Sequence, residues 1–293
     1  MRSKTIANYL PFICMSAFLI IVQVLALLLT PQMIAHEMQA FEDPQSVWNP
    51  IWYMGLILLF TLATLFIIKL KLRWVFRAFI MLAIWSTLWI VLFGLLIFAS
   101  PLEISVIGSL LGASILTVLV YKFPEWYVID VTGVLIGAGV TAIFGISLAI
   151  APTLLLLIGL AVYDAVAVYK TKHMIALAEG MMELRLPVIF VVPKRRGYSF
   201  LKDEPKKGER GAYFMGLGDA VIPSILVVSA KVFTVPPMGF LNLPALGTII
   251  GTLIGFGVLA KFVAKGKPQP GLPFLNTGAI IGFTVGCLSA GVL

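Results

Sequence analysis

Residues 212–228 read AYFMGLGDAVIPSILVV, a stretch that is apolar enough to open a membrane-spanning helix. It nevertheless contains a carboxylate, Asp219, directly preceded by Gly216-Leu217-Gly218. An aspartate at the centre of a spanning helix costs about 2.5–3.5 kcal/mol on insertion scales, and each glycine weakens a helix by about 1 kcal/mol relative to alanine. A chain that accepts these costs together is expected to use the stretch for its function.

Composition assigns the whole chain to the membrane. Of its 293 residues, 60% are hydrophobic and only 12% are charged, whereas soluble domains have about 45–50% apolar and about 25% charged residues. We therefore predict an all-α polytopic membrane protein, with residues 1–293 forming a single membrane domain in the lipid bilayer. The net charge of +8 is attributed to membrane topology, so no nucleic-acid partner is expected. Cysteine and histidine show no metal-ligand spacing, and neither a metal nor another cofactor is expected.

Nine stretches of about 20 mostly apolar residues are candidate spans. They lie near residues 7–30, 51–69, 75–99, 104–121, 128–146, 149–169, 213–233, 243–262 and 272–292. This assignment gives six helices within 1–169, a cytoplasmic loop over 170–212 and three helices within 213–293. Within the loop, we expect a short amphipathic helix over 171–184 and a strand over 186–193.

The distribution of basic residues predicts the orientation. With nine spans, the two termini lie on opposite sides of the membrane, and every Lys and Arg except Lys231 falls on the side of the N-terminus. The opposite loops contain acidic residues, namely Glu37, Glu42, Asp43 and Glu103. Because basic residues concentrate in cytoplasmic loops, the N-terminus is predicted to be cytoplasmic and the C-terminus outside.

Only two carboxylates fall well inside the predicted spans, Asp164 in LAVYDAVAVYK and Asp219. Glu125 and Asp130 are assigned to the inner edge of the fifth span. At 1.5 Å per residue, Asp164 and Asp219 both lie about 8–14 Å from the nearest cytoplasmic basic residue. Because the sixth and seventh helices run in opposite directions, their two carboxylates can face each other.

Two facing carboxylates in a site of low dielectric constant do not both ionise, so one is held protonated and the other charged. This is the working state of an aspartic protease, in which the charged member activates a water and the neutral member donates to the scissile carbonyl. No metal or cofactor is needed. Gly216 and Gly218, which lack side chains, would let water and a substrate backbone approach Asp219.

These residues resemble known motifs. Tyr163-Asp164 and Gly216-Leu217-Gly218-Asp219 are similar to the YD and GxGD motifs of the presenilin and signal peptide peptidase group of intramembrane aspartyl proteases. The third motif of that group, Pro-Ala-Leu, is expected at the inner end of the ninth span. There the chain reads Pro270-Gly271-Leu272, with Gly in place of Ala, and we prefer this segment to the literal Pro244-Ala245-Leu246 that opens the eighth span.

The resemblance implies an intramembrane aspartyl endopeptidase that cleaves within transmembrane segments, with Asp164 and Asp219 as its catalytic residues. The residues that would line the site are Tyr163, Gly216, Leu217, Gly218, Pro270, Gly271 and Leu272. A cytoplasmic N-terminus distinguishes presenilins from signal peptide peptidases, so the chain resembles a microbial, archaeal-type presenilin homologue. The resemblance further implies single-pass transmembrane substrates and a place in the cell membrane. A homo-oligomer is compatible with it.

Three other functions are compatible with the paired aspartates. One is a proton- or ion-coupled transporter, because intramembrane carboxylates also mark transport pathways. The second is a structural polar contact between helices, and the third is the other GxGD class, the prepilin peptidases. Transporters often contain internal repeats, and the two halves of this chain show no convincing similarity. The strand over 186–193 has two interpretations, pairing with an unwound substrate by β-augmentation or packing on the bundle as a short apolar loop.

Overall fold

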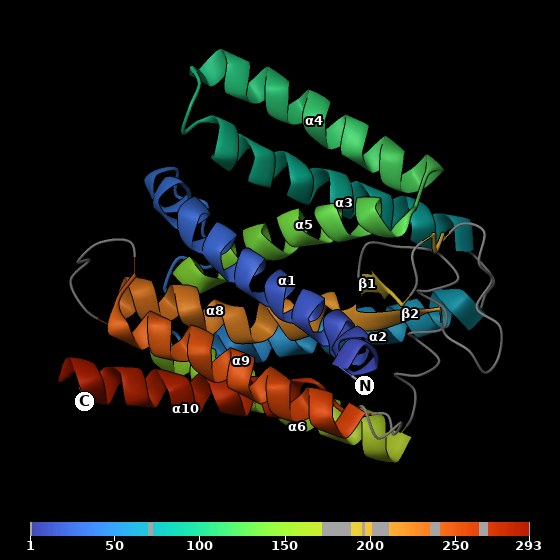
Figure 1. Ribbon diagram of the computed structural model, residues 1–293. Coiled ribbons are helices and arrows are strands. Elements are labelled where there is room, and N and C mark those ends of the chain that lie inside the picture. The colour runs from blue at the N-terminus through green and yellow to red at the C-terminus, as the bar shows by residue number, and fades with distance from the viewer. Residues whose placement is uncertain are drawn as a thin grey trace.

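Helices form along nearly every apolar stretch of the sequence (Figure 1). The structure is a computed structural model that describes residues 2–69, 73–171, 189–194, 197–200, 211–234, 241–263 and 269–292. Within these ranges the chain is mostly helical, with one two-stranded sheet. In a helix every interior backbone N–H and C=O is satisfied within the segment, which is what a backbone in lipid requires.

The first six predicted spans correspond to six helices. These are α1 (Arg2–Ala35), α2 (Trp48–Lys69), α3 (Arg73–Leu96), α4 (Leu102–Lys122), α5 (Trp126–Ser147) and α6 (Ile150–Val166). A π-helical turn, η1 (Ala167–Thr171), continues from α6. The two strands β1 (Ile189–Pro193) and β2 (Ala212–Gly216) follow, and then the helices α8 (Leu217–Phe233), α9 (Leu243–Val263) and α10 (Leu272–Ala290).

Seven of the helices in the described part of the chain are long and apolar enough to cross a membrane. Of the two remaining long helices, α2 offers a shorter apolar segment, Trp48–Thr64, and α8 has 17 residues, the lower limit for a span. The break between the fifth and sixth predicted spans is present, since α5 ends at Ser147 and α6 begins at Ile150. The structure therefore supports a multi-pass helical membrane protein.

Helix α8 occupies the middle of the bundle. It contacts α1, α5, α6, α9 and α10, and every residue from Ala220 to Ala230 is buried. Figure 1 shows α8 with α1 crossing it on one side and α9 and α10 running alongside. Because α8 is surrounded by other helices, its polar residues do not have to face lipid. This explains how the chain tolerates Asp219 in this helix.

Helices α9 and α10 pack more closely than any other pair through glycines. A β-carbon added to Gly251 would lie 2.8 Å from Cα of Gly282, and one added to Gly282 would lie 2.8 Å from Cα of Gly251. Gly247, Gly255, Gly278 and Gly286 meet the backbone of the opposite helix in the same way. Small residues at a spacing of four let helix backbones approach closely in membranes, and this contact holds the start of α10 in place.

The two termini lie at opposite ends of the bundle (Figure 1). The end that carries the N-terminus also carries the sheet and the connection between α4 and α5, and α10 finishes at the other end. This arrangement is what an odd number of spans requires. Which end faces the cytoplasm stays a prediction from the basic residues.

The sheet corrects the predicted boundary of the seventh span. Residues 212–216 form strand β2, so the helix begins at Leu217 and not near residue 213. An apolar run of this length fits a strand or a helix equally well by its pattern, and the choice is made by the neighbouring strand. β1 and β2 are antiparallel, with Val191 opposite Phe214.

The strand predicted over 186–193 is confirmed for residues 189–193, and residues 186–188 lie outside the described part of the chain. The amphipathic helix predicted over 171–184 also lies outside it, except for Thr171, which ends η1.

Candidate active site

Asp164 lies near the carboxyl end of α6, shortly before the π-helical turn η1. Its side chain is only 4% exposed. Its Oδ2 accepts a hydrogen bond of 3.1 Å from the backbone N–H of Leu272, the first residue of α10. Single π-helical turns are frequent at functional sites within helices. Here the π-helical turn η1 follows the buried carboxylate of Asp164, which accepts a hydrogen bond from α10.

Asp219 lies in the first turn of α8, immediately after β2 ends at Gly216. Its carboxylate packs against two glycines. A β-carbon added to Gly216 would lie 3.4 Å from Oδ2, and one added to Gly271 would lie 2.7 Å from Cγ and from both oxygens. Asp219 is partly exposed, and its carboxylate adjoins Gly271 while that of Asp164 is bonded to the next residue, Leu272. The two carboxylates therefore belong to one site.

The segment that opens α10 joins the two aspartates. Leu272 donates its backbone N–H to Asp164, and the neighbouring Gly271 packs against Asp219. Pro270, Gly271 and Leu272 are all buried. The structure thus brings together residues from α6, α8 and α10 that are far apart in the sequence, including the segment 270–272.

The alternative motif Pro244-Ala245-Leu246 lies elsewhere. It opens α9, which runs antiparallel to α10, and Cα of Pro244 would lie 2.8 Å from a β-carbon added to Gly286. Gly286 is about 21 Å along α10 from Leu272, at 1.5 Å per residue. Ala245 is fully buried in the main core. These residues pack the bundle at the end opposite to Asp164 and Asp219.

The substitution of Gly for Ala at position 271 has a steric cause in this chain. The carboxylate of Asp219 occupies the space that a β-carbon at 271 would need, because all three carboxylate atoms would lie 2.7 Å from it. Carbon and oxygen atoms in ordinary contact stay well beyond 3 Å. Glycine therefore allows Asp219 to lie directly against the start of α10, which also holds Asp164.

The other predicted site residues surround this pair in different ways. Gly218 is exposed, and a β-carbon added to it would meet no atom within 4 Å, so the side of Asp219 next to it is open. Leu217 packs into the core, with its Cδ1 3.1 Å from a β-carbon added to Gly137 of α5. Tyr163 is partly buried beside Asp164. Their roles in the reaction stay predictions.

A family model described as signal-peptide peptidase, presenilin aspartyl protease matches residues 16–292, nearly the whole chain. The chain belongs to this family.

Two solved structures, both described as a presenilin family intramembrane aspartate protease, are similar to the protein. The one in space group C222 is 42% identical, with a TM-score of 0.73, and the match covers 95% of this chain and 99% of the other. The one in space group P2 is 41% identical, also with a TM-score of 0.73, and the match covers 96% and 99%. A search of curated proteins found no match. The protein is an intramembrane aspartyl protease, an endopeptidase of the hydrolase class, and the transporter alternative has no support.

The protease contains a further buried carboxylate besides Asp164, at the position predicted to be the inner edge of the fifth span. Asp130 lies in α5 and is 3% exposed. Its Oδ1 accepts a hydrogen bond of 2.7 Å from the backbone N–H of Val191 in β1. The sequence shows only that Asp130 is an acid a few residues inside the fifth span. Its position along the span does not reveal whether its carboxylate contacts water or a backbone N–H, so the contact with Val191 could not be predicted.

A second acid at the start of α5 holds the chain that follows β1. The two oxygens of Glu125 accept hydrogen bonds from the hydroxyl of Ser199, at 2.6 Å, and from the backbone N–H of Phe200, at 3.0 Å. Phe200 and Val191 pack with Ile129 of α5 in one apolar cluster. The amino-terminal half of α5 is thus the platform on which β1 of the protease rests.

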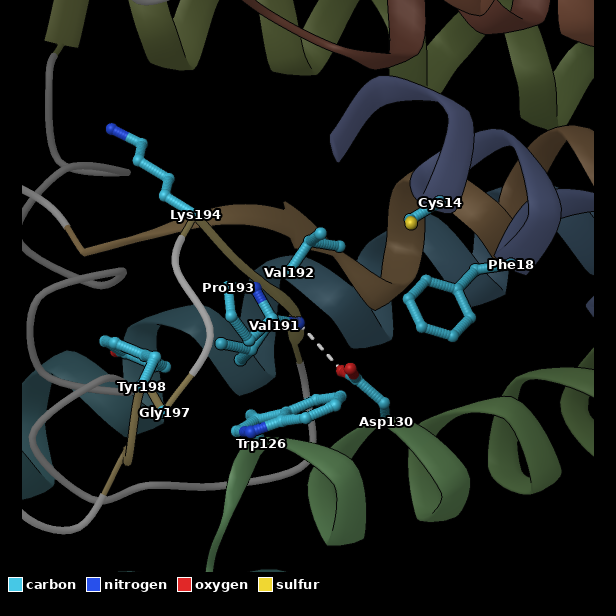
Figure 2. Close-up of a pocket in the computed structure, with 10 residues that line it drawn as sticks. All are labelled: Cys14, Phe18, Trp126, Asp130, Val191, Val192, Pro193, Lys194, Gly197 and Tyr198. Carbon is cyan, nitrogen blue, oxygen red and sulfur yellow. Dashed lines mark hydrogen bonds between the residues drawn. The ribbon is translucent and has the colours of Figure 1, made fainter. Parts of the chain in front are cut away.

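A cavity of about 470 Å³ lies beside this platform, between α1, α5 and β1. Figure 2 shows Phe18 of α1, Trp126 and Asp130 of α5, and the strand residues from Val191 to Lys194 around it. Neither Asp164 nor Asp219 lines it. The cavity is therefore separate from the pair of carboxylates.

Proposed function

We propose that Asp164 and Asp219 are the two catalytic carboxylates of this protease. The observation that carries the proposal is their common contact with the start of α10, where Leu272 holds one carboxylate and Gly271 adjoins the other. This arrangement supports a pair at one depth in the bundle, as the sequence predicted. The segment 270–272 would then position the pair, and Gly218 would leave Asp219 open to substrate.

The reaction is hydrolysis of a peptide bond by an activated water. One carboxylate of the pair, in its ionised form, takes a proton from water while the water oxygen attacks the scissile carbonyl carbon. The other carboxyl, protonated, donates its proton to the carbonyl oxygen. Collapse of the tetrahedral intermediate breaks the C–N bond, and a proton passes to the leaving amine. Because the two groups are coupled, the single proton belongs to the pair and not to one residue.

The substrate is expected to be a transmembrane protein in the bilayer, and we propose that it is single-pass. A transmembrane helix hides its peptide bonds, so it must unwind locally before water can attack. We propose that the unwound segment joins the outer edge of β2, which no strand of the described chain pairs with, as an added strand. β2 runs directly into the turn that carries Asp219, and Gly216 at its end adjoins the Asp219 carboxylate. We prefer this edge to the strand near 186–193, because on the outer edge of β1 the N–H of Val191 already bonds to Asp130 and Pro193 has no N–H.

We infer a topology of nine spans with the N-terminus in the cytoplasm and the C-terminus outside. The nine long helices of the described chain and the opposite positions of the two termini support it (Figure 1). The concentration of basic residues on the N-terminal side supports the sidedness. By the resemblance to presenilins, substrates would have their N-terminus outside, and a microbial protease of this kind would lie in the cell membrane.

The catalytic assignment is tested with purified protease and a single-span substrate. Asp164→Asn and Asp219→Asn retain the size of each side chain and remove its acid–base function. We expect each to lower the rate of peptide-bond cleavage by about 10²–10⁴-fold or more, the contribution of a positioned acid or base. Glu103→Gln, an exposed acid at the opposite end of the bundle, is the matched control and should cleave as wild type does. Folded Asn variants that cleave at the wild-type rate would refute the assignment.

A further inference from the structure

Asp130 is a buried carboxylate for which the cleavage reaction has no use. It lies on α5, away from the contacts between α6, α8 and α10 that form the site, and its side chain is 3% exposed. Burying a carboxylate is costly unless a hydrogen-bond donor compensates. Its one described donor is the backbone N–H of Val191, at 2.7 Å, and Figure 2 shows the side chain reaching from α5 to the edge of the strand.

The position of this hydrogen bond in the sheet is informative. In an antiparallel pair, residues alternate between those whose N–H and C=O face the partner strand and those whose N–H and C=O face away. Because the N–H of Val191 bonds to Asp130, Val191 faces away from β2, and so do Ile189 and Pro193 on the same strand. The hydrogen bond from Lys194 N to Gly211 O, at 3.0 Å, fits this alternation. Asp130 therefore occupies the outer edge of β1.

Two of the three outward-facing positions of that edge, Val191 and Pro193, offer no N–H to an added strand. Pro193 has no N–H to offer, and Asp130 already uses the N–H of Val191. The outer edge of β2 is different, since the alternation directs the N–H groups of Ala212 and Phe214 away from β1, while the N–H of Gly216 bonds to the Asp219 carboxylate. An unpaired strand edge invites pairing with another chain, and proteins block such edges with charges and prolines. The outer edge of β1 is therefore blocked by an acid and a proline, whereas the outer edge of β2 still presents backbone N–H groups.

We propose that Asp130 is a positioning residue of the protease that closes the outer edge of β1 and directs the unwound substrate to β2. The proposal rests on the proposed addition of a substrate strand to the sheet. Neighbouring strands lie about 4.8 Å apart. A substrate that joined β1 would therefore lie about 14 Å from its place beside β2 and about 10 Å from β2 itself, which leads into the Asp219 turn. That is too far for attack on its peptide bond.

The support of β1 by α5 also fixes where β2 stands. β1 is held to α5 by Asp130 at its centre, and Glu125 holds the chain just beyond it through Ser199 and Phe200. β2 contacts β1 along its whole length and continues into α8. Loss of the Asp130 contact would therefore both open the wrong edge and loosen the strand that leads to Asp219.

The test compares two substitutions of Asp130 in the full-length protease with a single-span substrate. Asp130→Leu removes the acceptor, and Asp130→Asn keeps an oxygen that can accept from Val191. We expect Asp130→Leu to lower kcat/KM by about tenfold, the effect of losing a buried hydrogen bond, and to add new cleavage positions in the products. Asp130→Asn should stay within about threefold of wild type and cleave the same bonds.

A double-mutant cycle isolates the contact itself. Val191→Pro removes the donor on an outward-facing position, where proline breaks no bond of the ladder. It should impair cleavage as Asp130→Leu does, and the double variant should be no worse than either single variant. Thr132→Val, a buried polar residue on the same helix, is the matched control and should retain the wild-type rate and cleavage positions.

The outcomes separate this proposal from the proposed function. If folded Asp130→Leu cleaves the same bonds with wild-type kcat/KM, or if Asp130→Asn is as impaired as Asp130→Leu, the positioning role is wrong. A purely structural role would lower the folded fraction without moving the cleavage positions. If Asp130→Leu does not fold, Val191→Pro decides, and wild-type behaviour of that variant refutes the proposal. Failure of the proposed function would appear instead as undiminished cleavage by Asp164→Asn or Asp219→Asn.

Discussion

At position 271 this protease has a glycine where the resembling families have alanine in their Pro-Ala-Leu motif. The residue lies between the two aspartates, since its neighbour Leu272 binds Asp164 while Gly271 itself adjoins the carboxylate of Asp219. The missing methyl group is therefore part of how Asp219 is placed. Gly216 differs, because an added β-carbon there would lie 3.4 Å from Asp219 Oδ2, a distance of ordinary contact that leaves the carboxylate in place.

We predict that Gly271→Ala lowers kcat. An added β-carbon would lie 2.7 Å from the Asp219 carboxylate, so the side chain of Asp219 must move. A displacement of about 1 Å in an active site can reduce the rate by about 10²-fold, and we expect a loss of about tenfold or more. Gly257→Ala on α9, where an added β-carbon meets nothing within 4 Å, is the control and should leave kcat unchanged. A wild-type kcat for folded Gly271→Ala would show that Asp219 tolerates the shift.

At the scale of the elements, the junction of β2 and α8 combines a strand edge with a candidate catalytic carboxylate. The strand offers backbone groups along its outer edge, and the helix that follows carries Asp219 in its first turn. Gly216 ends the strand in an extended conformation and Leu217 begins the helix, with Leu217 packed into the core. α8 is buried along most of its length, so the junction lies within the packed bundle.

The free edge of β2 can be tested with proline. Phe214→Pro removes an N–H that faces away from β1, so the ladder between the two strands keeps its bonds. Phe214→Ala removes the same ring and keeps the N–H, which makes it the matched control. If substrate joins this edge, kcat/KM of the proline variant should be about five- to tenfold below that of the alanine variant, the worth of one backbone hydrogen bond. Equal values in folded variants would exclude pairing at Phe214.

At the scale of the whole molecule, two pairs of packed helices flank a central pair. α3 and α4 pack at one side of the bundle, and α9 and α10 pack tightly at another, while α5 and α8 lie between them. The sheet lies toward the end that carries the N-terminus (Figure 1), and Asp219 lies in the first turn of α8, directly after β2. If that end is cytoplasmic, the substrate is cleaved near the inner side of the membrane.

The orientation is tested with single cysteines in a Cys14→Ser, Cys287→Ser background. We expect a membrane-impermeant thiol reagent applied to intact cells to label Val292→Cys, near the C-terminus, and to leave Ser3→Cys unlabelled. The basic residues on the N-terminal side are the physical reason, since Lys and Arg favour the cytoplasm. Both positions should react after the cells are broken, which controls for access. Labelling of Ser3→Cys alone in intact cells would reverse the topology.

The sequence by itself determined the class of fold, the candidate spans and the identity of the two candidate catalytic residues. Span-length apolar runs admit only helices in lipid, and an aspartate within such a run is costly enough to stand out. The comparison of depths then related Asp219 to Asp164. These inferences depend on properties that are readable along the chain, namely hydropathy, charge and distance from a helix end.

Only the tertiary structure decided what each short segment pairs with. Residues 212–216 became a strand because β1 lies beside them, although their own pattern also suits a helix. Asp130 became a buried contact because the backbone of Val191 reaches α5 from a distant part of the chain. The packing of Gly271 against Asp219 was likewise unreadable from spacing. Contacts between residues so far apart in sequence are set by how the helices pack, and no local property of the chain encodes them.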